Sequence, residues 1–314
     1  MAVAYIFPGQ GSQSAGMGKA LAEASPAARQ VWAEADAALG GPISTLAWGG
    51  PAEQLDLTEN AQPAILAASI AILRAAQDGW TTAGIAAPAP AFLAGHSMGQ
   101  YSALVAAGVL DLADAVRLVR RRGQLMQAAP DGAMAAIIGL DDARLPDLEA
   151  AGQAVGTFTI ANRNSPGQVV VSGERAAVEA AAEAAKGLGA RRAIVLPVSV
   201  AAHSPLMADA ATGMRTAIDA VAFRDPTVPL LANADARPLT TAAACRDELV
   251  EHLTRGVDWV RAVESMAAAG VDTFLEVGPG KVLTGLVKRI ATDATVIALD
   301  EPAAPGALRL PFTD

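Results

Sequence analysis

The sequence predicts an α/β fold in which a small ferredoxin-like domain is inserted into a larger domain with a parallel sheet. In both outer parts of the chain, short apolar runs alternate with segments of helical periodicity, which is typical of a parallel sheet with helices on its faces. In the middle of the chain the order becomes β-α-β-β-α-β, the ferredoxin-like order. We therefore expect residues 1–127 and 198–314 to form the large domain and residues 128–197 the small one.

The first part of the large domain begins with an apolar run at residues 3–7, which predicts a buried strand stopped by Pro8 and Gly9. A second strand is predicted at residues 92–94, directly before a glycine-rich turn. Helical periodicity predicts helices at residues 26–39, 62–77, 97–107 and 112–127, the third of them ended by Gly108.

The small domain and the last part of the chain follow from the same patterns. In the small domain we expect strands at 134–138, 157–161, 169–172 and 192–197, helices at 145–151 and 176–188, and a turn at 164–167. In the last part we expect strands at 228–231 and 273–277 and helices at 245–253, 260–269 and 281–290. Residues 302–314 hold three prolines, and we expect them to wrap the surface.

Composition narrows the classes of protein to which the chain can belong. With 314 residues, of which 52% are hydrophobic and 18% charged, the chain can bury a large core. The net charge of −9 argues against a nucleic-acid partner. Cys245, the single cysteine, excludes an intrachain disulfide and a cysteine zinc site. The chain begins without a basic signal-peptide region, and its longest apolar stretch is too short for a bilayer, so we expect a cytoplasmic protein with no membrane partner.

The segment Gly95-His96-Ser97-Met98-Gly99 has the pattern Gly-x-Ser-x-Gly between a predicted strand and a predicted helix. This context is typical of a nucleophile elbow, a strained turn that presents a serine hydroxyl. Small residues are needed on both sides of the serine because the turn brings the backbone close to itself. The pattern therefore predicts an acyl-transferring enzyme in which Ser97 carries the acyl group.

A serine nucleophile needs a base, and the chain has three histidines. His96 is adjacent to Ser97, and adjacent side chains diverge at such a turn. His203 follows the last strand of the small domain, where the chain re-enters the large domain, whereas His252 lies within a predicted helix. We therefore favour His203 as the base. No acid is marked out as the third member of a triad, and a backbone carbonyl could orient the imidazole equally well.

Two glycine loops and an arginine cluster complete the candidate features. The loop Phe7-Pro8-Gly9-Gln10-Gly11-Ser12-Gln13 matches neither a dinucleotide fingerprint nor a Walker loop, but it could lend an amide to an oxyanion hole. The loop from Glu276 to Lys281 is interpreted as a structural turn. Arginines cluster at positions 117, 120, 121, 122, 191 and 192, and such runs usually form a solvated face.

Together these segments resemble the malonyl-CoA:acyl carrier protein transacylase family of bacterial fatty acid synthesis. Matching segments occur in the family's order along nearly the whole chain, at residues 7–13, 95–99 with 101–104, 122–127, 164–168, 198–204 and 276–285. The resemblance implies a hydrolase-like α/β domain with a ferredoxin-like insert, in agreement with the elements predicted above.

The resemblance also implies a role for each matching residue. Ser97 is then the acyl-carrying nucleophile and His203 its base. The backbone amides of Gln10 and Met98 form the oxyanion hole. Arg122 pairs with the malonyl carboxylate, which a planar guanidinium binds in a bidentate manner. The backbone carbonyl at His252 orients the base.

The implied reaction has two steps and needs neither a metal nor a cofactor of its own. Ser97 takes the malonyl group from malonyl-CoA and releases coenzyme A, and the phosphopantetheine thiol of acyl carrier protein then removes the group. The partner proteins of this family are acidic, so Arg120, Arg121 or Lys281 could help to dock the carrier. We expect the enzyme to act as a monomer.

Three positions depart from the family pattern. Gln100 stands where the family often has Glu, and His252 stands where it usually has Gln or Asn. Ala201 and Ala202 precede His203, where related acyltransferases that reject branched substrates often carry a larger residue. The acyl range could therefore extend beyond malonyl.

Three rival interpretations remain at this point. A serine esterase or thioesterase would use Ser97, an acid such as Asp219 or Asp235, and His252. An acyltransferase of polyketide synthesis or malonate decarboxylation would use the same residues as the transacylase. A non-catalytic relative that binds carrier protein is disfavoured by the retained Ser97, His203 and Arg122.

Overall fold

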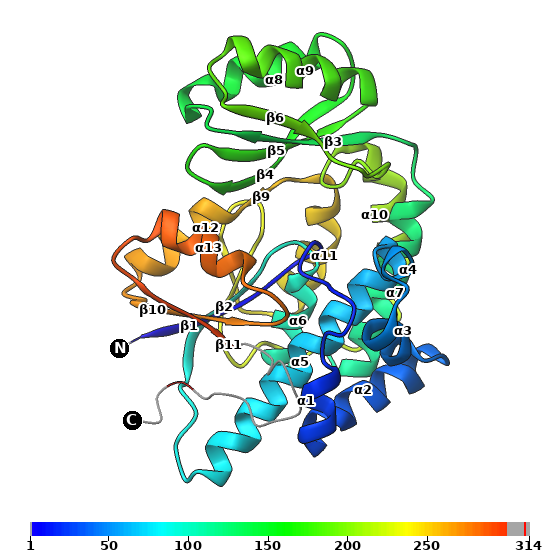
Figure 1. The fold of residues 1–314 in the computed structure, drawn as a ribbon, viewed down its shortest axis with the longest axis vertical. Coiled ribbons are helices and arrows are strands. Elements are labelled where there is room, and N and C mark those ends of the chain that lie inside the picture. The colour runs from blue at the N-terminus through cyan, green and yellow to red at the C-terminus, as the bar shows by residue number, and fades with distance from the viewer. Residues whose placement is uncertain (1, 300–310, 312–314) are drawn as a thin grey trace.

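A computed structural model of the chain describes residues 2–299 and Pro311. Two sheets organise the fold, a larger one built from both outer parts of the chain and a smaller one built mainly from its middle. Figure 1 shows the smaller sheet above the larger one, with helices α8 (Leu145–Gln153) and α9 (Arg175–Gly187) covering its outer face. The α/β class predicted from the sequence is confirmed, and the order of elements in the middle of the chain is consistent with the expected ferredoxin-like insert.

The larger sheet has the strand order β11-β10-β1-β2-β7-β8. All neighbouring strands are parallel except β7 and β8. The five residues of β1 are all buried, as expected for a central strand of a parallel sheet that is covered on both faces. The strands are β1 (Val3–Phe7), β2 (Pro90–Gly95), β7 (Leu230–Leu231), β8 (Pro238–Leu239), β10 (Thr273–Val277) and β11 (Thr295–Leu299).

Helices pack on both faces of this sheet, and the alternation of side chains along β1 separates the two cores. Val3, Tyr5 and Phe7 contact one core, and Ala4 and Ile6 contact the other. Helices of the first core are α1 (Lys19–Ala24), α2 (Pro26–Leu39), α3 (Ile43–Gly49), α4 (Ala52–Leu55), α5 (Thr58–Thr82), α6 (Gly99–Ala106), α7 (Leu112–Gln127), α10 (Ala208–Asp219) and α11 (Ala242–Thr254). The second core is formed with α12 (Trp259–Ala268) and α13 (Val282–Ile290).

The smaller sheet has the order β6-β3-β5-β4-β9, antiparallel except between β4 and β9. Its strands are β3 (Ala133–Ile138), β4 (Phe158–Ser165), β5 (Gln168–Gly173), β6 (Arg192–Val195) and β9 (Val257–Asp258). Strand β9 comes from the last part of the chain, so this sheet extends beyond the segment 128–197 expected from the sequence. The domain boundaries at 127/128 and 197/198 stay a prediction.

Several elements differ from the sequence-based expectation. Short helices α1, α3 and α4, helix α10, and strands β8, β9 and β11 were not predicted, because most are too short to show a period. Helix α5 begins at Thr58 rather than at residue 62, and the Glu59 amide donates to the Gln127 side chain at 3.0 Å. This start places Pro63 inside the helix, although a proline in a helix usually occupies the first turn.

The turn that begins at Glu276 caps the start of α13. Glu276 is buried, and its carboxylate accepts hydrogen bonds from the backbone amides of Leu283 and Thr284 at 3.0 and 2.7 Å.

The expected surface wrap at 302–314 lies outside the described residues except for Pro311. The carbonyl of Pro311 accepts a hydrogen bond from Trp80 Nε1 at 3.1 Å. Among the described residues, no helix is long and apolar enough to cross a membrane.

Candidate active site

Ser97 lies in the turn between β2 and α6 with its backbone in the left-handed region, at φ 53°. The turn is possible only because glycine flanks it. A Cβ added at Gly95 would lie 2.1 Å from the Gln100 nitrogen, and one at Gly99 would lie 2.2 Å from the Phe7 carbonyl oxygen. The elbow is therefore packed directly on itself and on the end of β1. It also explains why helix α6 starts at Gly99 instead of residue 97.

Two side chains hold this turn from behind. Asn233 Oδ1 accepts a hydrogen bond from the Ser97 amide at 2.8 Å. The buried Gln100 accepts from the Gly95 amide at 3.2 Å and donates to the Leu231 carbonyl at 3.1 Å. One side chain that both donates and accepts here must be an amide or a protonated acid, so Gln100 suits its position without a proton.

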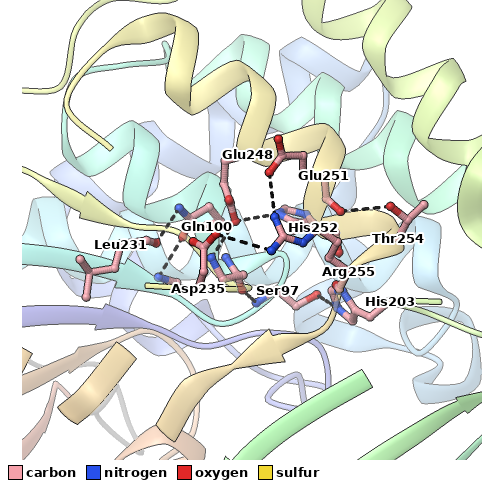
Figure 2. A network of polar contacts seen from close by, with 12 residues as sticks. Ser97, Gln100, His203, Leu231, Asp235, Glu248, Glu251, His252, Thr254 and Arg255 are labelled. Carbon is pink, nitrogen blue, oxygen red and sulfur yellow. Dashed lines mark hydrogen bonds and ion pairs between the residues drawn. The ribbon is translucent and has the colours of Figure 1, made fainter. Parts of the chain in front are cut away.

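Ser97 and His203, which are 106 residues apart, meet at hydrogen-bond distance. The Ser97 hydroxyl donates to His203 Nε2 at 2.8 Å, and His203 Nδ1 donates to the carbonyls of His252 at 2.5 Å and Arg255 at 3.2 Å. Figure 2 shows the imidazole between the serine and the carbonyls at the end of α11. The imidazole is therefore oriented by backbone oxygens rather than by a carboxylate.

The imidazole of His203 is poised to accept a proton. Burial, and after it the positive charge of Arg122, lowers the pKa of His203 to about 3. The ring is therefore neutral across the physiological range, and its Nδ1 proton is committed to the carbonyls. Nε2 then carries the free lone pair that faces the Ser97 hydroxyl, which is the arrangement a general base needs.

Arg122 extends from α7 into the same site. Its side chain is buried, with 1% relative exposure, and Nη2 donates to Ser97 Oγ at 3.2 Å. Burial lowers its pKa. Within residues 2–299 no carboxylate pairs with this guanidinium, and its Nε has no hydrogen-bond partner. A buried cation without a counter-ion is costly, so the site is suited to a ligand that carries an anionic group.

The other arginines of α7 point elsewhere. Arg117 pairs with Asp114 at 2.9 Å on the exposed face, Arg120 donates to Asn60 at 2.5 Å, and Arg121 is exposed. The expected solvated face therefore describes Arg117 and Arg121, but not Arg122.

The first glycine loop lies against the elbow. A Cβ at Gly9 would come within 2.6 Å of the His96 carbonyl oxygen, so this loop approaches the turn closely. The backbone amides of Gln10 and Met98 donate no hydrogen bond to another backbone group in the described part of the chain. Both amides are thus available for an oxyanion, which is the role that the resemblance implies for them.

The remaining histidines do not contact Ser97. His96 donates to Asn164 Oδ1 at 2.9 Å across the boundary with the smaller sheet. The His252 ring is buried and neither of its nitrogens has a hydrogen-bond partner among the described residues. Asp235 pairs with Arg237 at 2.9 Å, and Asp219 is exposed at the end of α10. The rival triad of Ser97, Asp219 or Asp235, and His252 is therefore not assembled.

Two contributors to the site were not predicted from the sequence. Asn233 follows a strand of only two residues, and its contact with Ser97 spans 136 positions, so no local pattern marked it. Arg255 contributes its carbonyl, which any residue could do. The described residues contain no group of three or more side chains suited to hold a metal ion.

Residues 4–301 match the family model described as acyl transferase domain. The chain is 50% identical to the malonyl CoA-acyl carrier protein transacylase of Escherichia coli (strain K12) over 310 residues, covering 97% of each chain. An acyl carrier protein S-malonyltransferase from Vibrio cholerae O1 superposes with a TM-score of 0.91 at 44% identity, covering 97% of this chain and 98% of the other. A malonyl-transacylase solved in complex with its type II PKS acyl-carrier protein gives 0.90 at 43% identity, with coverages of 96% and 97%.

The three histidines predict how stability depends on pH. Burial lowers the pKa of His96, His203 and His252 below the ordinary value of 6.5. Below that pH the unfolded chain takes up protons that the folded chain does not, so the free energy of unfolding falls as the pH is lowered.

The variant His252→Gln removes one of these groups. Between about pH 7 and about pH 5 its loss of stability should be smaller than that of the wild type, by up to about 1.4 kcal/mol per pH unit below the ordinary histidine pKa. Urea unfolding of both proteins at the two pH values measures the difference. Equal losses would show that His252 is not held neutral in the fold.

Proposed function

The chain belongs to the acyl transferase family, and on this basis we propose that it transfers a malonyl group from malonyl-CoA to the phosphopantetheine thiol of an acyl carrier protein. The observation that carries the proposal is the buried, unpaired guanidinium of Arg122, which lies 3.2 Å from the hydroxyl of Ser97. A free carboxylate on the acyl group supplies the missing counter-ion beside the reacting atom. Acetyl groups lack that carboxylate.

In the first step, Ser97 Oγ attacks the thioester carbonyl and its proton moves to His203 Nε2. The C–S bond then breaks, and the coenzyme A sulfur leaves with the proton from Nε2. The carbonyls of His252 and Arg255 keep the ring in one orientation while it is protonated. The amides of Gln10 and Met98 stabilise the tetrahedral oxyanion.

In the second step, the phosphopantetheine thiol gives its proton to His203 and its sulfur attacks the malonyl-serine ester. The Ser97 oxygen leaves and recovers the proton from Nε2, so the enzyme returns to its starting state. The pKa of about 3 for His203 favours this return, because the imidazolium gives up its proton readily. The phosphopantetheine arm arrives on the partner, and the chain itself needs no cofactor.

The partners and the setting complete the proposal. The carrier protein docks through basic groups, among which Arg120, Arg121 and Lys281 are candidates. The enzyme acts as a monomer in the cytoplasm. It supplies the elongation steps of fatty acid synthesis. The relative solved with a type II PKS carrier makes polyketide synthesis the second candidate pathway for the same transfer.

The acyl range extends beyond malonyl in this proposal. Ala201 is buried and Ala202 half-buried, and both precede His203 at the site. Methyl side chains leave room beside the acyl group, which supports slow transfer of a branched group such as methylmalonyl.

The variant Ser97→Ala should form no malonyl-enzyme adduct, because it lacks the oxygen that carries the group. Intact-protein mass spectrometry after mixing with malonyl-CoA measures the adduct in both proteins. An adduct that persists in the variant would place the acyl group on another residue.

The variant Arg122→Ala should lose malonyl transfer by about two to four orders of magnitude, since an unpaired buried carboxylate costs about 3–5 kcal/mol and each tenfold corresponds to about 1.4 kcal/mol. Acetyl transfer should hardly change. Rates with malonyl-CoA and acetyl-CoA and one acyl carrier protein provide the comparison. An equal loss for both acyl groups would remove the carboxylate role.

The two buried histidines should respond differently to substitution. His203→Ala should slow acylation by about 10²–10⁴-fold, whereas His252→Gln keeps the backbone carbonyl and should stay within about tenfold of the wild type. Single-turnover acylation by malonyl-CoA measures both. The opposite ranking is what the esterase interpretation predicts.

A further inference from the structure

Glu248 is a buried carboxylate that the proposed mechanism does not use. Glu248 lies on α11, and its side chain has 1% relative exposure. Its Oε1 accepts a hydrogen bond from the backbone amide of Asn233 at 2.7 Å. Burial raises the pKa of Glu248 to about 7, against the opposing effect of the Asn233 amide and of Arg237. The nearest cationic nitrogen is Arg237 Nη2, 3.7 Å from Oε2. Because burying a carboxylate costs free energy, Glu248 is a candidate for a role in the site that it contacts.

One connection runs from Glu248 to the nucleophile. The carboxylate holds the backbone of Asn233, and the Asn233 carbonyl in turn accepts from the Asp258 amide at 2.7 Å. The backbone N–H and C=O of Asn233 are thus both hydrogen-bonded. In this position the side-chain Oδ1 accepts a hydrogen bond from the backbone amide of Ser97 at 2.8 Å. This hydrogen bond secures a residue whose left-handed backbone is otherwise disfavoured.

The base lies near the same carboxylate without a hydrogen bond to it. His252 lies one helical turn further along α11, and its neutral ring places Nδ1 3.8 Å from Glu248 Oε1, with no hydrogen bond between them. The carbonyl of that same residue accepts the Nδ1 proton of His203. Figure 2 shows Ser97, His203, Glu248 and His252 within one group of polar side chains. The hydrogen bonds that link Glu248 to the dyad are therefore those that run through Asn233.

We propose that Glu248 is a positioning residue for the reaction: by fixing the backbone of Asn233, it holds the elbow residue Ser97 in place. The inference rests on the proposed acyl transfer. It assigns the carboxylate an acceptor role, in which its geometry at the Asn233 amide matters more than its charge. Glutamine can fill that role because its side-chain carbonyl occupies the same place.

The test compares variants by the rate constant of single-turnover acylation with malonyl-CoA, followed by rapid quench and intact-protein mass spectrometry. Glu248→Met removes the acceptor and leaves the Asn233 amide buried and unpaired, whereas Glu248→Gln keeps an acceptor. Glu248→Asp draws the carboxylate back from the amide and keeps the charge. Asp247→Leu is the matched control, because Asp247 lies on the same helix and pairs outward with Arg215 at 2.9 Å.

We expect Glu248→Met to slow acylation by about ten- to a hundredfold with an unchanged KM for malonyl-CoA, because Arg122 is untouched. Glu248→Gln should be at least about tenfold faster than Glu248→Met, and Asp247→Leu should match the wild type. If Glu248→Met does not fold, Glu248→Asp should still be slower than Glu248→Gln. The double variant Glu248→Met/Asn233→Ala should be no slower than the worse of its single variants, since both act through one hydrogen bond.

The amplitude of adduct formation measures how much of the enzyme is folded and active, whereas the rate constant measures how well the site is positioned. A purely structural role predicts a lower amplitude with an unchanged rate constant in Glu248→Met, and this result would overturn the inference. So would equal rates for the Gln and Asp variants, or additive losses in the double variant. Wild-type protein that forms no malonyl adduct would instead reject the proposed function itself.

Discussion

The buried guanidinium of Arg122 is the constraint on which the site depends. An unpaired cation in the core costs stability, and an anionic ligand would supply the missing charge. Its Nη2 also donates to Ser97 Oγ, so the group that we propose to recognise the acyl carboxylate contacts the proposed nucleophile. Burial is the larger cause of the lowered pKa of His203, and the charge of Arg122 adds to it. The cationic group therefore lies directly beside the pair that transfers the proton.

A second constraint is the cramped elbow. The left-handed Ser97 is possible because Gly95 and Gly99 leave no Cβ to collide with the backbone, and because β1 ends directly beneath it. The parallel sheet brings the ends of β1, β2 and β7 to one edge, where the glycine loop after β1, the elbow and Asn233 lie together. The smaller sheet adds Asn164, which holds His96 away from the nucleophile.

Local chemistry explains which parts of this site the sequence could predict. The elbow was visible because its glycines are a steric requirement at fixed spacing. Arg122 recurs with Ala115, Val119 and Met126 on the buried face of α7, a helical period that distinguishes it from Arg121. Asn233 and Glu248 could not be found in this way, since their roles depend on contacts between distant segments. The start of α5 was misplaced because tertiary contacts outweighed the preference of Pro63 for a first turn.

The most direct test of the account is a crystal structure of the enzyme loaded with malonyl-CoA. We predict that the acyl group is on Ser97 Oγ, with its free carboxylate bound by the guanidinium of Arg122 in a bidentate manner and its carbonyl oxygen directed at the amides of Gln10 and Met98. A malonyl carboxylate that points into solvent, with Arg122 still unpaired, would contradict the claim that this buried charge selects the substrate.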